Sequence, residues 1–290
     1  MSTYAYYPGC SLHGTAKEYD RSARLVCQTL GLELREVEDW NCCGASSAHM
    51  VSRWLALSLP ARNLQLVERM GLETMTVPCA ACYARLKDVS HELKDPEVRA
   101  KIGRVLGGQV TGRVTVEPLI GTLTTQEILD KAAGMIKKPL TGLKVATYYG
   151  CLLTRPPKVA QFDVPENPQS MDRLLRVLGA QVVEWYFKTE CCGANLPVAR
   201  TDIVLDLSRK LLAAAKQAGA EAIVTACPMC HSNLDSRQGE IRGRYGDDFK
   251  MPVFFFTELL GLALGYPARE LLIANHLTDA LSLLQGRGLA

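Results

Sequence analysis

The sequence predicts an α/β protein made of two similar tandem domains, each with a sheet of parallel strands. Three observations lead to this fold class. The chain has 290 residues, which suggests two domains at a typical ~150 residues per domain. Four phrases recur in the same order in the two halves, which indicates an internal duplication. Between these phrases, short β-rich runs alternate with longer helical runs, as in βαβ units.

The repeated phrases define the domains. "TYAYYPGCSLHG" matches "VATYYGCLLTRP", "NCCGAS" matches "ECCGAN", "TVPCAACYARL" matches "TACPMCHSNL", and "VTVEPLIGTL" matches "VFFFTELLGLAL". We expect a first domain over residues 1–133, a linker over 134–143 and a second domain over 144–290. The linker mixes Gly, Pro and Lys without periodicity, as connecting segments do.

Short runs rich in β-branched and aromatic residues predict four strands in each half. The strands are expected at 4–7, 34–37, 74–77 and 114–116, and at 144–149, 181–185, 222–225 and 252–256. Longer runs with apolar residues at helical spacing predict the helices. The helices are expected at 17–30, 51–69, 124–131, 169–178, 202–218 and 257–264. Strands that alternate with helices imply parallel pairing within each domain.

Composition and charge exclude several classes of protein. The chain is 48% apolar and 22% charged, as expected for a globular protein. Its 33 basic and 30 acidic residues give a net charge of +3 without a basic tract, which argues against a nucleic-acid or membrane-surface protein. No apolar run approaches the ~18 residues of a spanning helix. The first residues, "MSTYAYYPGC", lack signal-peptide features, so we expect a cytoplasmic protein.

Ten of the eleven cysteines form two sets with the same order, C-x31-CC-x35-C-x2-C and C-x39-CC-x34-C-x2-C. The sets are Cys10, Cys42, Cys43, Cys79 and Cys82, and Cys151, Cys191, Cys192, Cys227 and Cys230. Each set follows predicted strands, and loops converge at the carboxyl ends of parallel strands. We therefore expect five sulfurs at one edge of each sheet. Cys27 has no partner in the repeat and is expected to be a buried, inert thiol.

In a reducing compartment, such cysteines favour metal ligands or redox groups over structural disulfides. Structural zinc needs four ligands and leaves the fifth cysteine unexplained. A thiol–disulfide relay would use the CxxC pairs but gives no role to the adjacent pairs. An iron-sulfur cluster takes thiolate ligands, and the diverging side chains of an adjacent pair could reach two irons. Gly44 and Gly193 are expected to let the backbone pass close to an inorganic core.

The doubled Cys-Cys-Gly motif resembles the catalytic B-type subunit of heterodisulfide reductase over essentially the whole chain. Further phrases agree, namely "YPGCSL" at 7–12, "FDVPENP" at 162–168 and "CPMCHSNLD" at 227–235. The resemblance implies that all ten cysteines bind two noncubane 4Fe-4S clusters, with a disulfide substrate between them. It also implies two partners, a flavin-containing A-type subunit and a ferredoxin-like C-type subunit. The x34 gap before Cys227 departs by one residue from its counterpart.

Two functions follow from these features. The first is a catalytic subunit that cleaves or forms a disulfide by paired one-electron transfers. The second is a relay that passes electrons to a flavin or quinone partner, because the motif also occurs in subunits of lactate, glycerol-3-phosphate and some succinate oxidoreductases. The chain has no G-x-G-x-x-G or P-loop motif for a nucleotide.

Four further side chains are candidates for the site. His13 and His231 each follow a cysteine of one set, and we predict them as proton donors. The alternative is a surface or outer-layer histidine that only hydrogen-bonds to the site. Arg155 and Lys158 follow Cys151 and are predicted to bind an anionic group of the substrate, with a solvated basic patch as the alternative.

Overall fold

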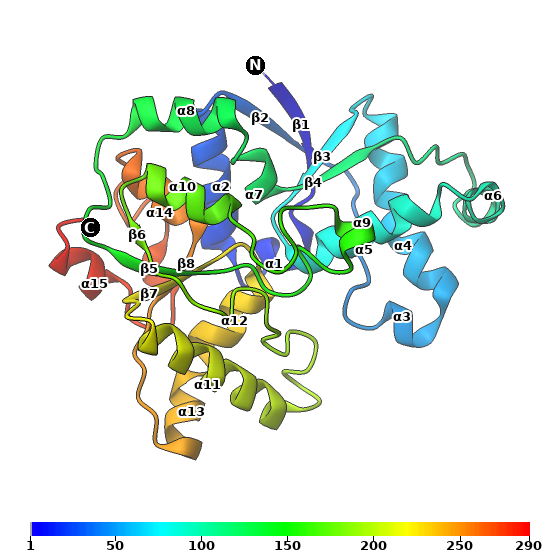
Figure 1. The fold of residues 1–290 in the computed structure, drawn as a ribbon. Coiled ribbons are helices and arrows are strands. Elements are labelled where there is room, and N and C mark those ends of the chain that lie inside the picture. Colours follow the sequence, from blue (N-terminus) through cyan, green and yellow to red (C-terminus); the bar gives the residue numbers. More distant parts are fainter. Residues whose placement is uncertain (1) are drawn as a thin grey trace.

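A computed structural model describes residues 2–290 and contains two α/β units, each with a four-stranded parallel sheet (Figure 1). The strand order is β2-β1-β3-β4 in the first unit and β6-β5-β7-β8 in the second. Every neighbouring pair is parallel. The predicted fold class is confirmed, because both units have the same topology.

The first unit alternates strands with the helices that cover them. Its strands are β1 (Ser2–Tyr6), β2 (Leu32–Glu36), β3 (Thr74–Val77) and β4 (Thr115–Pro118). Its helices are α1 (Gly9–His13), α2 (Lys17–Thr29), α3 (Ala48–Val51), α4 (Arg53–Arg69), α5 (Ala80–Glu92), α6 (Pro96–Val105), α7 (Leu119–Thr122) and α8 (Gln126–Met135).

The second unit repeats this order. Its strands are β5 (Lys144–Tyr148), β6 (Gln181–Val182), β7 (Ala222–Thr225) and β8 (Val253–Phe255). Its helices are α9 (Pro157–Ala160), α10 (Ser170–Val177), α11 (Thr201–Gln217), α12 (Pro228–Ser236), α13 (Gln238–Tyr245), α14 (Phe256–Ala263), the short 3-10 helix η1 (Ile273–Asn275) and α15 (Leu281–Gly286).

All eight strands lie where the sequence predicts them, although β6 is shorter than its predicted range. The sequence analysis missed α5 and α12, the helices that begin at the two CxxC motifs. The first turn of α5 is buried on all sides, from Ala80 to Ala84. A turn buried all round has no polar face, so the apolar periodicity that marks a surface helix is absent.

The predicted linker lies against the second unit. The backbone N–H groups of Lys137 and Lys138 both donate to the carbonyl of Ala263, at 2.9 and 3.0 Å. Helix α8 ends at Met135, inside the predicted range 134–143. Met1, where the predicted first domain starts, lies outside the described residues. The domain boundaries stay a prediction.

The two units pack through a buried interface. Helix α2 of the first unit packs against α14 of the second, and α1 packs against α12. The hydroxyls of Ser22 and Thr257 lie 2.6 Å apart, and those of Thr29 and Tyr266 lie 2.8 Å apart. One continuous buried core extends through both units. The interface therefore places α1, α5 and α12, which carry cysteines, near the middle of the molecule (Figure 1).

Among residues 2–290, none of the helices combines the length and the apolar character needed to span a lipid bilayer.

Candidate metal centre

Both cysteine sets lie at the carboxyl ends of the strands, as their order in the sequence predicts. In the first unit, Cys10 lies on α1, Cys42 and Cys43 lie between β2 and α3, and Cys79 and Cys82 lie at the start of α5. In the second unit, Cys151 follows β5, Cys191 and Cys192 precede α11, and Cys227 and Cys230 lie at the start of α12. All eleven cysteines are free thiols.

Within each set, one member of the adjacent pair contacts the CxxC motif. The sulfurs of Cys43 and Cys82 lie 3.3 Å apart, and those of Cys192 and Cys230 lie 3.6 Å apart. All four of these residues are buried. The adjacent pair and the CxxC motif, which are far apart in the sequence, are thereby brought together in each unit.

The other member of each adjacent pair lies at the outer end of its set. The neighbouring thiol of Cys10 lowers the pKa of Cys42 well below its ordinary value. In the same way, the thiol of Cys151 lowers the pKa of Cys191 to about 6, with help from the backbone N–H groups after it. The thiolate is the form of cysteine that binds metal. In each set, therefore, the outer member of the adjacent pair has a pKa lowered toward the form that binds metal.

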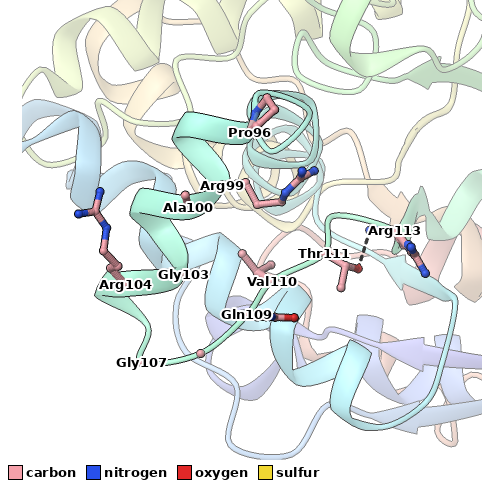
Figure 2. A pocket seen from close by; sticks show the side chains of 11 residues that line it. Pro96, Arg99, Ala100, Gly103, Arg104, Gly107, Gln109, Val110, Thr111 and Arg113 are labelled. Atoms are coloured by element: carbon pink, nitrogen blue, oxygen red, sulfur yellow. Dashed lines mark hydrogen bonds between the residues drawn. The ribbon is translucent and has the colours of Figure 1, made fainter.

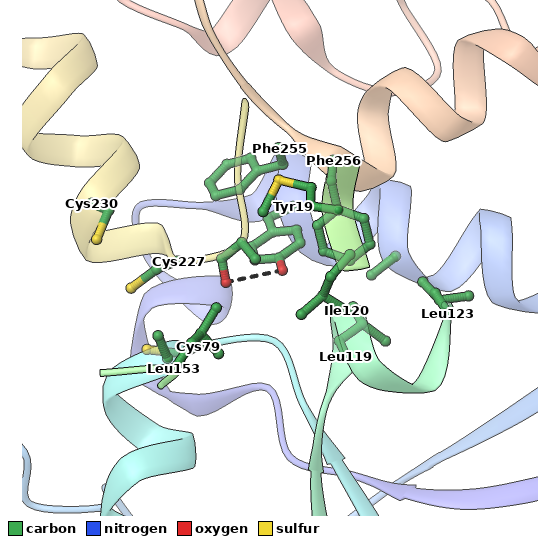
Figure 3. Packing of buried hydrophobic residues seen from close by; sticks show 14 of the residues in the cluster. Tyr19, Cys79, Leu119, Ile120, Leu123, Leu153, Cys227, Cys230, Phe255 and Phe256 are labelled. Carbon is green, nitrogen blue, oxygen red and sulfur yellow. Dashed lines mark hydrogen bonds between the residues drawn. The ribbon is translucent and has the colours of Figure 1, made fainter. Parts of the chain in front are cut away.

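The inner ends of the two sets meet across the interface. Cys227 and Ala80, the residue directly after Cys79, line the same small cavity, and the neighbouring thiol of Cys227 raises the pKa of Cys79. The neighbouring thiols of Cys230 and then of Cys79 lower the pKa of Cys227. Figure 3 shows Cys79 and Cys227 close together below the ring of Tyr19. The two sites are therefore direct neighbours.

Two tyrosines hold the adjacent pairs in place, and the sequence analysis missed them. The hydroxyl of Tyr7 donates to the carbonyl of Asn41 at 2.8 Å, and that of Tyr148 donates to the carbonyl of Glu190 at 2.6 Å. Each carbonyl belongs to the residue directly before an adjacent pair. The available signal was a tyrosine three residues before the first cysteine in both copies, in "YPGC" and "YYGC".

Two glycines bring the backbone close to sulfur. Gly9 and Gly150 precede the first cysteine of each set and have φ values of +71° and +67°. A Cβ on Gly9 would lie 3.0 Å from the sulfur of Cys82, and one on Gly150 would lie 3.0 Å from that of Cys230. A side chain at either position would fill space beside the sulfurs. The glycine that follows Cys10 closely, Gly14, shows no such approach to sulfur.

The contacts of Gly44 and Gly193 give a different reason for glycine from the predicted one, which stays a prediction. Both have positive φ, at +77° and +79°, which glycine adopts without a steric penalty. A Cβ on Gly44 would meet the Cβ of Ala48 at 2.7 Å, and one on Gly193 would meet Val204 at 3.1 Å. At both positions the missing Cβ leaves room for a side chain of a neighbouring helix rather than for a cysteine sulfur.

The chemistry of these residues fits an iron-sulfur cluster. The backbone N–H of Gly44 donates to the sulfur of Cys42 at 3.5 Å, and that of Gly193 donates to the sulfur of Cys191 at 3.3 Å. Hydrogen bonds to cysteine sulfur are a means by which proteins tune such clusters. Within residues 2–290, no three His, Cys, Asp or Glu side chains are arranged around the position of a single ion.

A small cavity lies where the two units meet beside the second set. Its volume is ≈ 10 Å³, and its walls combine Ala80 and Ala81 of the first unit with cysteines of the second. These cysteines are Cys151, Cys192, Cys227 and Cys230. A larger cavity of ≈ 780 Å³ follows α6 and the loop before β4, where Arg99, Arg104 and Arg113 line it without any cysteine (Figure 2). The smaller cavity is the one at the chemical site.

The two candidate histidines lie in different surroundings. The side chain of His13 is 49% exposed, and its Nε2 lies 3.0 Å from Glu36. His231 is buried, and its Nε2 lies 2.8 Å from the carbonyl of Val253. Burial, and then the neighbouring His276, hold the pKa of His231 well below its ordinary value. His13 is therefore open to solvent, whereas His231 is a buried, neutral ring.

The two candidate basic residues lie at the surface near Cys151. The guanidinium of Arg155 donates to Glu166 at 3.1 Å and to the hydroxyl of Thr189 at 3.4 Å. Lys158 lies on α9 and is exposed. The guanidinium of Arg155 already uses hydrogen-bond donors on Glu166 and Thr189, so Lys158 is the cation with more donors free to bind an anion.

Fold and site together define a duplicated cysteine-rich protein. Residues 4–87 and 145–235 each match the cysteine-rich domain family CCG. The chain is 34% identical over 281 residues to the "8-methylmenaquinol:fumarate reductase membrane anchor subunit" of Wolinella succinogenes, covering 97% of this chain and 98% of that one. It is 33% identical over 293 residues to the B-type subunit of the "Ferredoxin/F(420)H(2)-dependent CoB-CoM heterodisulfide reductase" of Methanosarcina acetivorans, covering 98% and 96%.

A solved structure shares the fold. A hypothetical protein from Helicobacter pylori superposes with a TM-score of 0.76 at 14% identity, over 96% of this chain and 52% of that one. The chain belongs to the family of CCG cysteine-rich domain proteins that contains the B-type subunits of heterodisulfide reductase. It is an iron-sulfur subunit of a redox complex, and the relatives are likewise subunits of multi-subunit reductases.

Proposed function

We propose that the chain is the catalytic subunit of a heterodisulfide reductase-like complex, in which a disulfide is cleaved or formed between two noncubane 4Fe-4S clusters. Each five-cysteine set would hold one cluster. When bound, the clusters would supply the two electrons that an S–S bond takes up on cleavage, one from each cluster, and two protons complete the two thiols. The observation that carries this proposal is that the two CxxC turns meet at the buried interface, where the hydroxyl of Tyr19 lies 3.1 Å from the carbonyl before Cys79 and 3.3 Å from the carbonyl before Cys227.

The proposed roles of the nearby side chains follow from their surroundings. His13 would deliver a proton at the first site, since its ring is open to solvent. For His231 the carbonyl of Val253 can only accept, so Nε2 carries the hydrogen and Nδ1 must first take up a proton before it can donate one. Arg155 and Lys158 would bind an anionic group of the substrate beside Cys151.

Electrons would reach this protein from partners. We propose a flavin-containing A-type subunit and a ferredoxin-like C-type subunit, because the chain itself has no nucleotide motif. The cytoplasmic location stays a prediction from the sequence.

A second candidate is an electron relay that binds no disulfide. The relative from Wolinella succinogenes favours it, since that protein is named as part of a fumarate reductase. In this case the paired clusters would pass electrons to a flavin or quinone partner, and the cavity beside Cys151 would hold no substrate.

Reoxidation of the reduced protein distinguishes the two functions. The anaerobically purified complex would be reduced, and the CoB-CoM heterodisulfide, glutathione disulfide or a quinone would be added in parallel. We expect one of the disulfides to reoxidise the protein and to yield two thiols per disulfide. Reoxidation by the quinone and by neither disulfide would establish the relay instead. Iron analysis that gives a single cluster per chain would contradict both versions of the two-cluster site.

A further inference from the structure

Tyr19 lies at the junction of the two cysteine sets. It is located on α2 and is fully buried. Its hydroxyl lies 3.1 Å from the carbonyl of Pro78 and 3.3 Å from the carbonyl of Ala226. These are the residues directly before Cys79 and Cys227, so one hydroxyl contacts both CxxC turns.

The hydroxyl links two different units. Pro78 ends the connection from β3 to the first CxxC motif, whereas Ala226 occupies the same place in the second unit. A tyrosine hydroxyl has a single hydrogen, so it is shared between the two carbonyls. A buried carbonyl that loses its donor carries a desolvation penalty, and this penalty favours the arrangement in which both turns stay close to Tyr19.

The ring of Tyr19 is itself held by aromatic packing. It stacks on Phe255 with a centroid distance of 4.1 Å and an interplanar angle of 9°. Phe256 contacts it edge-on at 6.1 Å. His231, which follows Cys230, also stacks on Phe255, at 4.2 Å. The stack therefore connects Tyr19 of the first unit to the CxxC helix of the second.

We propose that Tyr19 is a positioning residue that fixes the two CxxC turns relative to each other and thereby sets the electronic coupling between the two iron-sulfur sites. The inference rests on the two-cluster part of the proposed function. Coupling between two redox centres falls steeply with their separation, and the turns that carry Cys79 and Cys227 are the parts of the two ligand sets that share the hydroxyl of Tyr19. A residue that locks these two cysteines together controls that separation without touching a substrate.

The test is the magnetic interaction between the clusters in Tyr19→Phe, measured by EPR on the reduced, anaerobically purified complex. We expect the full iron and sulfide content of the wild type, but a reduced or absent splitting between the two cluster signals. Tyr6→Phe is the matched control, because Tyr6 is equally buried and its hydroxyl donates to Asp20 at 2.9 Å, away from both CxxC turns. The control should lose stability and keep the wild-type splitting.

Phe255→Leu provides a second variant, since it removes the stack while keeping the hydroxyl of Tyr19. We expect an intermediate loss of splitting. An unchanged splitting in Tyr19→Phe, or a wild-type protein with two clusters and no magnetic interaction, would overturn the role of Tyr19 and leave the proposed function standing. One cluster per chain in the wild type would instead overturn the proposed function.

Discussion

The two cysteine sites share most of their contacts to sulfur, but at the second site the amide of Asn233 also lies 3.6 Å from the sulfur of Cys192, and the equivalent position in the first unit is Arg85. Both keep the tyrosine that holds the adjacent pair, the glycine beside the CxxC sulfur and the contact between pair and CxxC motif. The residue after the CxxC motif is Tyr83 in the first unit and His231 in the second. The duplication therefore preserved the ligand cage, while the surroundings diverged.

The difference is mainly electrostatic. The hydroxyl of Tyr83 donates to the carbonyl of Ala160 at 2.5 Å and carries no charge. His231 instead packs edge-on against His276 at 4.7 Å, and the Nε2 of His276 lies 2.9 Å from Glu258. A buried, titratable histidine pair, His231 and His276, therefore lies beside the second site, whereas the corresponding position at the first site holds the uncharged Tyr83. The two sites can hold the same kind of group and still respond differently to pH.

The largest expected effect comes from removing the inner cysteine of an adjacent pair. Cys43→Ala should lose the cluster of the first unit and Cys192→Ala that of the second, because each contacts its CxxC sulfur. Iron content should fall by about half in either variant, since thiolates are the cluster ligands, with the fold retained by circular dichroism. Cys27→Ala, which alters a buried thiol on α2, should keep all its iron. Full disulfide turnover by Cys43→Ala would count against this ligand assignment.

The next effect tests the glycines that face sulfur. Gly9→Ala and Gly150→Ala introduce a Cβ 3.0 Å from a cysteine sulfur as well as an unfavourable positive φ. We expect a loss of stability of roughly 1–2 kcal/mol from the backbone, together with loss of iron from the affected unit.

The matched controls are Gly71→Ala and Gly219→Ala, with φ values of +69° and +80° and nothing within 4 Å of the new Cβ. They should lose similar stability in urea titrations and keep their iron. Equal iron loss in both groups of variants would show that backbone strain, rather than the approach to sulfur, is responsible.

A pH-dependent effect, which does not touch the cysteines, separates the two units. Burial alone would lower the pKa of His276, but the carboxylates of Glu258, Asp235 and Glu18 outweigh it and raise the pKa to about 8. Because the folded-state value lies above the unfolded value of 6.5, the stabilisation is complete below about pH 6.5 and is lost as the pH rises through 8.

The expected size is roughly 2 kcal/mol between these two pH values. His276→Gln should abolish this pH dependence in urea unfolding of the anaerobic protein, whereas Tyr83→Phe should leave it intact. His231 acts in the opposite direction and below about pH 6.5, because its pKa is lowered. A His276→Gln protein that keeps the wild-type slope from pH 6.5 to 8 would disprove the assignment.

The smallest effect should be equal in the two units. Tyr7→Phe and Tyr148→Phe each remove a hydroxyl that donates to the carbonyl before an adjacent pair. We expect each to cost about 1 kcal/mol of unfolding free energy, the typical worth of such a hydrogen bond. Tyr186→Phe, at a fully exposed tyrosine, should change nothing. A clear difference between Tyr7→Phe and Tyr148→Phe would mean that the ligand cage is less symmetric than its geometry indicates.

Much of the site could be predicted because the cysteines follow strands. Parallel strands end at one edge of a sheet, so the sequence order of Cys10, Cys79, Cys151 and Cys227 already implied two sulfur-rich edges. Gly9 and Gly150 stand next to cysteines in the repeated phrases, but nothing in the sequence shows which sulfur they approach. Helix α5 was missed because burial on all sides removes the periodic pattern from its first turn.

The sequence by itself determined the duplicated α/β fold and the two five-cysteine sets, because strand periodicity, repeat order and ligand spacing are local properties of the chain. Only the tertiary structure decided that the two CxxC turns meet, with the hydroxyl of Tyr19 shared between the carbonyls before Cys79 and Cys227. The physical reason is that this junction depends on how α2 packs against α14 across the interface, and such packing between distant segments leaves no periodic signature in either half.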